Sequence, residues 1–550
     1  MISSSEKEVV VEFTLGGFNL TSVDTQNGIQ NIVSVPKMSS MLEAGSPDLP
    51  QFPVPAIIGD MAEMNVSVVK STYTDYENIE IAPSKGNFSR QIDPETMPYT
   101  YGSMYNQNAF YPAAQAYLET PYIIRDFRGQ NIMVRPFAYN PVTKTLRVYH
   151  GMTIAMNKVS DNGVNQKVAR KANSKMSAEM DAAYSHRFIN YAESAAKYTF
   201  LQDHGEMLII CADQFVEAMQ PFVDWKNQSG RPTTMVSVTE VGGNNDTQIK
   251  SYIQGIYNDP DHYLGYILLV GDYNHITPHS MSNGRSDNWF GQLEGNDYYL
   301  EVLVGRFSVQ SINDVETHVN KVLYYERDMP EGLTWLNKGI GIAANEGAGN
   351  GHFGEADYVH MNFVRDTLLH YTYETVTQQY SGVGSGTSAT AISNDVNAGA
   401  SIINYCNHGS QTSWAVANYS NSHVDALVND DKWPYIWSVA CNNGQFDGTC
   451  FGEAWLRATN NNTGAPTGAI GGMFSWISQP WQPPMYGQDE MVDILTGWKS
   501  SDKYCHTFGG ASLNGNMYVL DAAPSDNGAT HNTWILFGDP SLMVRTDNPI

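Results

Sequence analysis

The spacing of hydrophobic residues along the chain changes once, close to Gly205. Upstream, apolar and polar residues alternate in short segments such as residues 8–15, and this period of two predicts β-strands joined by Pro-rich turns. Downstream, short apolar runs alternate with helix-like stretches such as residues 215–228, which is typical of a doubly wound α/β sheet. The runs that predict its strands are residues 207–211, 234–238, 266–270, 340–344, 401–405, 435–440, 468–474 and 534–537.

This pattern divides the chain into three parts. Residues 1–158 are β-rich, and residues 198–550 form an α/β part without an internal repeat. Between them, residues 159–197 are polar, rich in alanine and dotted with basic side chains, so they are predicted as an exposed linker or a loose helix. The expected fold class is therefore α/β, with a parallel-sheet domain that follows a β-rich domain.

Composition limits the class of protein. Hydrophobic residues make up 42% of the 550 residues and the mean hydropathy is −0.34, without an apolar run long enough to span a membrane. The formal charge of −26 disfavours a nucleic-acid partner, because phosphate binding needs clustered Lys and Arg. The acidic balance either suits cationic substrates or only reflects a well-solvated surface.

Five cysteines give no disulfide framework in a chain of this length, and their odd number leaves at least one free thiol. They are Cys211, Cys406, Cys441, Cys450 and Cys505. The first residues, Met-Ile-Ser-Ser-Ser-Glu-Lys, lack the apolar core of a signal peptide. These observations fit a cytosolic protein as well as a secreted one whose signal segment is not part of this chain.

Two of the apolar runs end close to reactive side chains. His408 follows the run at residues 401–405, and Cys441 follows the run at residues 435–440. The two residues are 33 positions apart, which leaves room for one helical crossover between them. Neighbouring parallel strands open onto a common crevice at their carboxyl ends, where an imidazole can stabilise a thiolate nucleophile. Gly409 permits close approach of a substrate, and its N–H could form an oxyanion hole with that of Cys441. The pattern alone leaves a catalytic pair and a chance placement of a core thiol equally open.

Longer local matches extend this pair. Residues 404–414 (Asn-Tyr-Cys-Asn-His-Gly-Ser-Gln-Thr-Ser-Trp) and 438–444 (Ser-Val-Ala-Cys-Asn-Asn-Gly) resemble the gingipain-type cysteine peptidases. Further segments similar to that family are residues 222–228, 269–272, 295–299, 484–491 and 537–542. The matches occur in the family's order and cover about residues 198–550. The resemblance implies a caspase-like α/β peptidase domain preceded by a β-rich inhibitory prodomain.

The resemblance assigns roles to four residues near the strand ends. Cys441 would be the nucleophile and His408 the general acid and base, with the Gly409 and Cys441 amides facing the oxyanion. Glu346 matches the acidic residue that orients the imidazole and stabilises its cationic form. From the sequence alone, an acid after a strand is usually just solvated.

Substrate preference follows from the same resemblance. Asp357 lies eleven residues after Glu346, as the pocket aspartate does in the arginine-specific members, and a carboxylate there would hold a guanidinium with two hydrogen bonds. Lysine-specific members carry their pocket acid where this chain has Pro480. Cleavage after Arg is therefore favoured, with a Lys-specific peptidase as the alternative. Other residues matching the pocket are Trp481, Gln479 and Met485, which without the resemblance would be ordinary packing residues.

An oxygen-rich cluster suggests calcium, and no organic cofactor is expected. The family has a structural Ca²⁺ held by side chains that match Asp272, Asp297 and Glu301 here and by main-chain oxygens that match Glu294 and Tyr299. A second Ca²⁺ would fall to the main chain of Phe446 and to Glu453 and Asp489, although the loop between residues 444 and 450 is two residues shorter than in the family. Scattered acids of this kind are otherwise most often surface charge.

The family is made as secreted, extracellular or surface-bound zymogens, and this chain carries residues suited to that. Arg170, Arg187 and Lys197 are candidate activation cleavage sites ahead of the catalytic part. Arg125 or Arg128 would inhibit by placing a basic side chain of the prodomain into the specificity pocket. The expected partners are peptide substrates with a basic residue before the scissile bond, and the chain's own prodomain.

Three other functions remain to be weighed. A binding or adhesion protein could keep the fold without turnover, but the joint presence of Cys441, His408, Glu346 and Asp357 argues against it. A nucleotide-binding α/β enzyme is disfavoured because no Gly-rich phosphate loop follows the first strand. An intracellular caspase-like protease is disfavoured by the β-rich segment and the calcium-type cluster.

Overall fold

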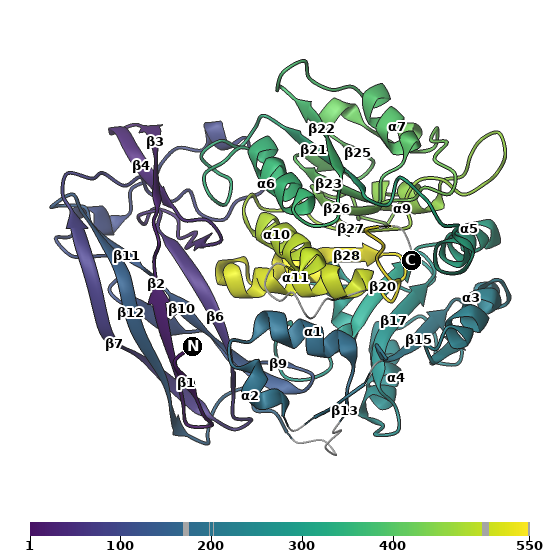
Figure 1. Cartoon of the computed structure of the whole chain (residues 1–550), viewed down its shortest axis with the longest axis horizontal. Coiled ribbons are helices and arrows are strands. Elements are labelled where there is room, and N and C mark those ends of the chain that lie inside the picture. The colour runs from purple at the N-terminus through teal and green to yellow at the C-terminus, as the bar shows by residue number, and fades with distance from the viewer. Residues whose placement is uncertain (169–174, 197, 202, 498–504, 506, 548–550) are drawn as a thin grey trace.

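The computed structural model describes the chain except residues 169–174, 197, 202, 498–504, 506 and 548–550. A β-rich N-terminal part lies beside a larger α/β part, with helices α1 (Ala178–Arg187) and α2 (Tyr191–Ala195) between them in sequence (Figure 1). The predicted fold class is confirmed.

The N-terminal part consists of two five-stranded antiparallel sheets and a hairpin. One sheet runs in the order β1-β2-β12-β11, and β7 also pairs with β12. Its strands are β1 (Ser3–Ser4), β2 (Glu8–Thr14), β7 (Glu63–Tyr76), β11 (Phe137–Asn140) and β12 (Thr145–Ser160). The other sheet runs in the order β5-β6-β10-β8, with β9 also paired to β10. Its strands are β5 (Ser39–Ser40), β6 (Pro50–Ile58), β8 (Ala116–Leu118), β9 (Tyr122–Ile124) and β10 (Phe127–Val134), and the hairpin is β3 (Asn19–Thr25) with β4 (Gly28–Ser34).

Alternation of side chains explains why these segments form half-buried strands. In β2, Val9 and Val11 are buried whereas Glu8 and Glu12 are exposed. Val9 pairs with Met156 and Val11 with Ile154 on β12, and all four side chains belong to one core between the sheets. The period of two therefore predicts both the strand and the face that it buries.

The α/β part is built on one ten-stranded sheet in the order β16-β15-β17-β20-β28-β27-β26-β23-β21-β22. Only the β27–β28 pair is antiparallel. The strands are β15 (Glu206–Cys211), β16 (Thr233–Ser237), β17 (Leu264–Val270), β20 (Leu303–Phe307), β21 (Lys338–Ala344), β22 (Thr375–Ser381), β23 (Ile402–Cys406), β26 (Tyr435–Val439), β27 (Gly471–Ser475) and β28 (Trp534–Phe537). The central strands are fully buried and mostly apolar, because helices cover both faces of the sheet.

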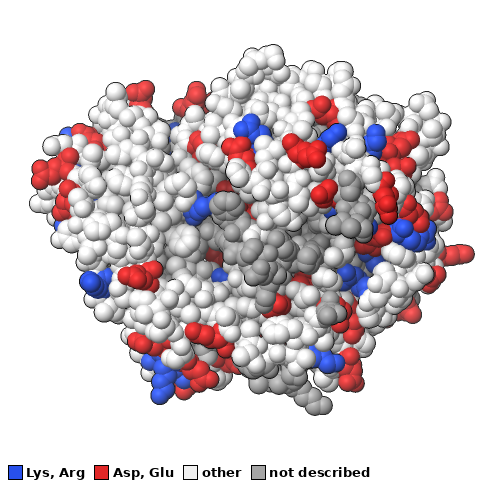
Figure 2. Space-filling view, viewed as in Figure 1, with Lys and Arg blue, Asp and Glu red and all other residues white. Residues whose placement is uncertain are grey.

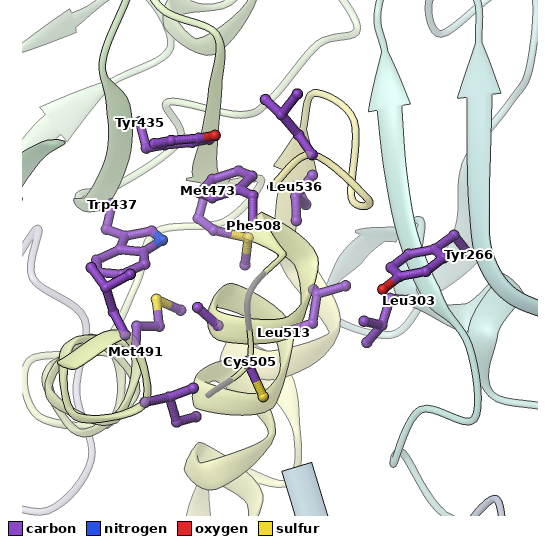
Figure 3. Packing of buried hydrophobic residues seen from close by; sticks show 14 of the residues in the cluster. Tyr266, Leu303, Tyr435, Trp437, Met473, Met491, Cys505, Phe508, Leu513 and Leu536 are labelled. Atoms are coloured by element: carbon purple, nitrogen blue, oxygen red, sulfur yellow. The ribbon is translucent and has the colours of Figure 1, made fainter. Parts of the chain in front are cut away.

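Among the residues that the structure describes, ten helices accompany these strands. Two of them lie on the side that faces the N-terminal part (Figure 1). Helices α10 and α11 pack on each other, and α11 also contacts β6. Figure 3 shows Met491 of α10 and Phe508 of α11 among the sheet residues Tyr435, Trp437 and Met473. The helices are α3 (Val216–Gln228), α4 (Asp246–Asn258), α5 (Ile312–Leu323), α6 (Asp357–Leu369), α7 (Ala389–Ala398), α8 (Asn421–Val424), α9 (Phe451–Arg457), α10 (Pro483–Thr496), α11 (Phe508–Ala522) and α12 (Ala529–Thr533).

The segment predicted as an exposed linker or a loose helix is partly a packed element. In α1, Met180 and Tyr184 are buried in the core shared with the α/β part, and Phe188 follows them there. Ser177 caps the helix, because its side chain accepts a hydrogen bond from the Met180 N–H. The alanine-rich, polar composition hides this face, since Ala182 and Ala183 are buried in the same core beside the two larger apolar side chains of the helix.

The charged side chains on the surface reflect the acidic composition of the sequence. Figure 2 shows acidic side chains scattered over this face of both parts, with fewer basic ones among them. Within the described residues, no helix combines the length and apolar character needed to cross a bilayer.

Candidate active site

The side chains implied in catalysis lie beyond the carboxyl ends of four adjacent strands. Glu346 follows β21, His408 follows β23 and Cys441 follows β26, and these strands are neighbours in the sheet. The segment after β27, the next strand, carries Gln479 and Trp481. Parallel strands bring their ends to one edge, so residues 95 positions apart in sequence (346 to 441) converge there.

His408 and Glu346 form an ion pair. The His408 Nε2 lies 3.1 Å from the Glu346 Oε2, and both side chains remain partly exposed. The hydrogen bond from His408 lowers the pKa of Glu346, partial burial opposes this, and a second hydrogen bond from Asn407 adds to the lowering. Glu346 is thus held ionised, in the state that stabilises an imidazolium.

Cys441 is buried beside this pair. Its side chain is 1% exposed and its Sγ lies 3.9 Å from the carbonyl oxygen of Gln479. Burial raises the pKa of the Cys441 thiol, and the positive charge of Arg90 partly offsets that increase. Cys441 is therefore shielded from solvent while the N-terminal part is docked.

Gly409 brings the histidine loop against the cysteine loop. A Cβ at Gly409 would lie 2.9 Å from the Cβ of Ala440 and 3.0 Å from the carbonyl oxygen of Cys441, which is too close for a larger residue without a shift. The His408 carbonyl is fixed by the Tyr405 hydroxyl, which donates to it at 2.6 Å, and by the Ala415 N–H at 3.0 Å. Glycine is thus required by the close approach of the two loops.

A buried arginine from the N-terminal part occupies the space beside Asp357. Arg90 and Asp357 are 0% and 1% exposed, and the Arg90 Nη1 lies 3.1 and 3.0 Å from the two oxygens of Asp357. The Nη2 donates to the Trp481 carbonyl at 3.0 Å and approaches the Cys406 Sγ at 3.4 Å. The guanidinium also lies 4.5 Å from the centroid of the Trp481 ring. This pocket therefore binds a guanidinium by charge, by hydrogen bonds and by an aromatic face.

The backbone around Arg90 binds as an added strand. The Arg90 N–H donates to the Gln479 carbonyl at 2.8 Å, and the Trp481 N–H donates to the Phe88 carbonyl at 3.1 Å. Ser89 and Pro480 form the antiparallel bridge between these two bonds. Extended peptides bound to an edge use the same pairing of main-chain groups, which fixes the register of the side chain that enters the pocket.

The other three residues that match the family's pocket contribute in different ways. Gln479 acts through its carbonyl, while its buried side-chain amide has no hydrogen-bond partner among the described residues. Met485 lies in the first turn of α10 and is part of the buried core. Trp481 supplies both its ring and its carbonyl, and Gly347 is a glycine because a Cβ there would lie 2.6 Å from that ring.

Comparisons with known proteins bear on this geometry. The peptidase family C25 matches residues 201–545, and the C25 propeptide matches residues 1–197. The chain belongs to peptidase family C25. The predicted resemblance is confirmed, and the N-terminal part is the C25 propeptide.

Curated C25 relatives come from Porphyromonas gingivalis. Gingipain R1 is 36% identical over 99% of this chain and 54% of its own length, and gingipain R2 is 35% identical over 99% of this chain and 74% of its own. Lys-gingipain is 26% identical over 85% of this chain. The chain thus spans about half the length of gingipain R1.

Solved structures agree with the family. The Arg-specific cysteine proteinase gingipain R (RGPB) has a TM-score of 0.60 at 36% identity, over 62% of this chain and 79% of that one. A complex of the RgpB pro- and mature domains has a TM-score of 0.58 over 62% of this chain and 80% of that one.

In this C25 propeptide, the arginine at the pocket is not one of the two predicted. Arg125 lies in the β9–β10 turn, where its Nη1 donates to the carbonyls of Leu264 and Glu301 and its guanidinium lies 4.1 Å from the Tyr263 ring. Arg128 donates to main-chain carbonyls of the propeptide itself. Because both side chains are bound elsewhere, the prediction that one of them fills the specificity pocket is wrong. The arginine in the pocket is Arg90.

The first predicted calcium cluster contacts the propeptide. Asp297 accepts hydrogen bonds from the Ile123 N–H at 2.9 Å and from the Asn165 side chain at 2.7 Å. The Glu301 carboxylate accepts the Leu293 N–H at 2.5 Å. Among the described residues, no group of three possible ligands within 4.8 Å includes the predicted set, Asp272, Glu294, Asp297, Tyr299 and Glu301. Calcium at this cluster stays a prediction.

The second predicted set is also spread over different partners. Phe446 packs on Trp476 and Phe537. Glu453 accepts from the Ser308 hydroxyl at 2.6 Å and contacts Arg457, while Asp489 lies 2.9 Å from the Nε2 of His352. The described residues instead gather the possible metal ligands His352, Glu355 and His360.

Of the candidate activation sites, only Arg187 falls within the described residues. It ends α1, is 9% exposed and is ion-paired with Asp521, so cleavage there requires the helix to come away first. Arg170 and Lys197 lie outside the described residues.

Sequence reasoning missed three residues of the site. Arg90 lies in a segment without regular structure, and it is one of five arginines before residue 159, which pattern alone does not distinguish. Cys406 and Asn407 lie inside the motif that contains His408, so their position was signalled but their side-chain direction was not. Both contact Asp357, because β23 ends at Cys406 and the chain bends at Asn407 instead of continuing the alternation of the strand.

Proposed function

We propose that the chain is the zymogen of a cysteine endopeptidase that cleaves peptide bonds after arginine. The observation that carries this proposal is the guanidinium of Arg90, held by both oxygens of the buried Asp357 next to Cys441. Asp357 takes one nitrogen of the guanidinium and the Trp481 carbonyl takes the other, an arrangement that suits the planar guanidinium better than the single ammonium nitrogen of lysine. The Arg-specific relatives are also more similar to the chain than Lys-gingipain is.

The residues at the strand ends support an acyl-transfer mechanism. The Cys441 thiolate attacks the carbonyl carbon after the arginine, and the oxyanion that forms accepts hydrogen bonds from the Gly409 and Cys441 amides. The protonated His408, stabilised by Glu346, gives its proton to the leaving amine. His408 then takes a proton from water, which hydrolyses the thioester and restores the thiol.

Latency follows from the same pocket. Arg90 and its neighbours pair with Gln479 and Trp481 as a substrate strand would, so the propeptide excludes substrate by occupying its binding register. Removal of the propeptide would free the pocket and expose Cys441. Secretion is part of the proposal through the family resemblance, while bound calcium stays a prediction and no step depends on it.

The test compares matched fluorogenic peptides that carry Arg or Lys before the scissile bond, with protein whose propeptide has been removed. Cleavage of the Arg peptide, lost in Cys441→Ala, is the expected result. Preference for Lys would overturn the role of Asp357. Absence of cysteine-dependent cleavage of both peptides after verified processing would favour a binding protein on a peptidase fold.

A further inference from the structure

One buried side chain touches both carboxylates of the site. Asn407 follows β23 and is 2% exposed, and its Nδ2 lies 3.0 Å from the Glu346 Oε2 and 3.0 Å from the Asp357 Oδ2. Both neighbours are acceptors when ionised, so only the NH₂ end of the amide can face them. Each of its two N–H groups therefore serves one carboxylate.

These contacts join the specificity pocket to the catalytic pair. On one side, Asp357 receives the Arg90 guanidinium at 3.0 Å, and on the other, Glu346 receives the His408 Nε2 at 3.1 Å. Asn407 lies between them, so the path from guanidinium to imidazole consists of hydrogen bonds no longer than 3.1 Å. An uncharged double donor is what two neighbouring carboxylates need, because without it they would repel each other.

We propose that Asn407 is a positioning residue that couples the filling of the Asp357 pocket by a guanidinium to the alignment of Glu346 with His408. This inference rests on the proposed function. When the pocket is empty, the buried charge of Asp357 draws on Asn407 as a main donor. A guanidinium supplies the counter-charge of Asp357, so that one N–H of the amide suffices there and the other holds the half-exposed Glu346 against the imidazole, as it does with Arg90 in the pocket.

The effect is expected on turnover more than on binding. Asn407→Ala removes one of the two donors that hold Glu346, and a hydrogen bond to a charged group is typically worth a factor of about ten or more. The variant should lower kcat about tenfold or more and raise KM for an Arg peptide only a few-fold. Asn407→Asp, of the same size, replaces the donor by a third acceptor and should lower kcat further.

Alkylation of Cys441 by iodoacetamide tests the coupling without a substrate. In the processed wild type, n-butylguanidinium should accelerate alkylation about threefold or more, because it fills the pocket while the small reagent still reaches the thiol. In Asn407→Ala the acceleration should shrink to less than about 1.5-fold. Asn429→Ala is the matched control, since Asn429 is fully buried but donates to the carbonyls of Lys432 and Gly468, away from the site.

The outcomes separate this inference from the proposed function. A wild type without Arg-peptide cleavage overturns the proposed function and this inference with it. A cleaving wild type overturns the coupling alone if Asn407→Ala keeps its kcat, or if butylguanidinium accelerates alkylation equally in wild type and variant. Equal losses of kcat in Asn407→Ala and Asn429→Ala, with equal losses of thermal stability, would reduce Asn407 to a structural role.

Discussion

Two buried arginines of the propeptide contact the catalytic part in different ways. Arg90 meets a buried carboxylate and follows Ser89, which forms an isolated antiparallel bridge with Pro480 as the main chain of a bound substrate would. Arg125 meets main-chain carbonyls and the rings of Tyr257 and Tyr263, at the end of β9. The first contact is a charge pair of the kind that recognises a substrate side chain. The second contact consists of hydrogen bonds to the main chain and of packing against aromatic rings.

This difference teaches which contact inhibits and which one anchors. A side chain that fills the pocket competes directly with substrate, whereas one held by carbonyls far from Cys441 only keeps the two parts together. Charge alone does not distinguish them, because both guanidinium groups are nearly fully buried, at 0% and 8% exposed for the whole residues. The distinguishing feature is the partner.

Substitution of the pocket carboxylate should have the largest effect. Asp357→Asn leaves the guanidinium of a bound arginine without its counter-charge, and breaking a buried pair costs about 3–5 kcal/mol. We expect kcat/KM for the Arg peptide to fall about 100-fold or more in processed enzyme. Asp366→Asn, on the exposed side of the same helix and paired with Arg365, should leave kcat/KM unchanged. Equal activity in the two variants would contradict the pocket assignment.

Substitution of Arg90 should have the second-largest effect. It tests directly whether Arg90, rather than Arg125, blocks the pocket. Arg90→Ala in the uncleaved chain empties the pocket while the anchor remains, so initial hydrolysis of the Arg peptide should rise about tenfold or more over the wild type. Arg90→Lys should rise less, because an ammonium still meets Asp357 but lacks the second nitrogen that donates to the Trp481 carbonyl. Rates are taken before any linker cleavage is visible on a gel. A larger rise in Arg125→Ala than in Arg90→Ala would reverse the comparison.

The same contrast explains how far sequence reasoning reached. The two-residue and helical periods predict the half-buried strands of the propeptide and the apolar strands of the sheet, because those patterns follow from burial. The motifs around His408 and Cys441 place both at strand ends, since parallel topology brings such ends together. Within the catalytic part, local sequence and topology therefore suggest the pair of His408 and Cys441, whereas Glu346 and Asp357 were assigned from the family resemblance.

Contacts between the two parts were not predictable in this way. Which arginine enters the pocket, Arg90 or Arg125, depends on how the two parts dock. Docking geometry produces no periodic pattern in the sequence. The amphipathic face of α1 was hidden for a related reason, because its apolar residues face the other part of the molecule. Asp297 and Glu301, which the sequence suggests as calcium ligands, also accept N–H groups of the propeptide, a contact that only the docked structure reveals.

Loss of the anchor should have a moderate effect. Arg125→Ala removes two hydrogen bonds and two ring contacts without emptying the pocket, so the cleaved but still associated complex should dissociate at about tenfold higher concentration. The measurement is the gain of Arg-peptide activity as the cleaved complex is diluted. Full inhibition should return at high concentration, and a residual active fraction there would show that Arg125 takes part in blocking the pocket. Arg147→Ala, which removes an ion pair within the propeptide, is the control.

The smallest effect concerns pH and a single carboxyl group at the anchor. Burial raises the pKa of Asp297 in the docked form to about 6 from its ordinary 3.8, although hydrogen bonds from Ile123 and Asn165 oppose this. A raised pKa means that the docked form binds the proton more tightly, so docking strengthens as pH falls through 6 and the gain levels off below about 4.

Between pH 7.5 and 5.5 the gain from Asp297 should be about fourfold in the dissociation constant of the cleaved complex, if the undocked group has its ordinary pKa. Other groups titrate in this range, among them Asp493, whose pKa burial raises to about 6 beside Lys37. The contribution of Asp297 is therefore read as the difference in pH dependence between wild type and Asp297→Asn, which cannot titrate. A variant with the same pH dependence as the wild type would show that Asp297 does not sense docking, and the anchor would then depend on Arg125 without a contribution from this acid.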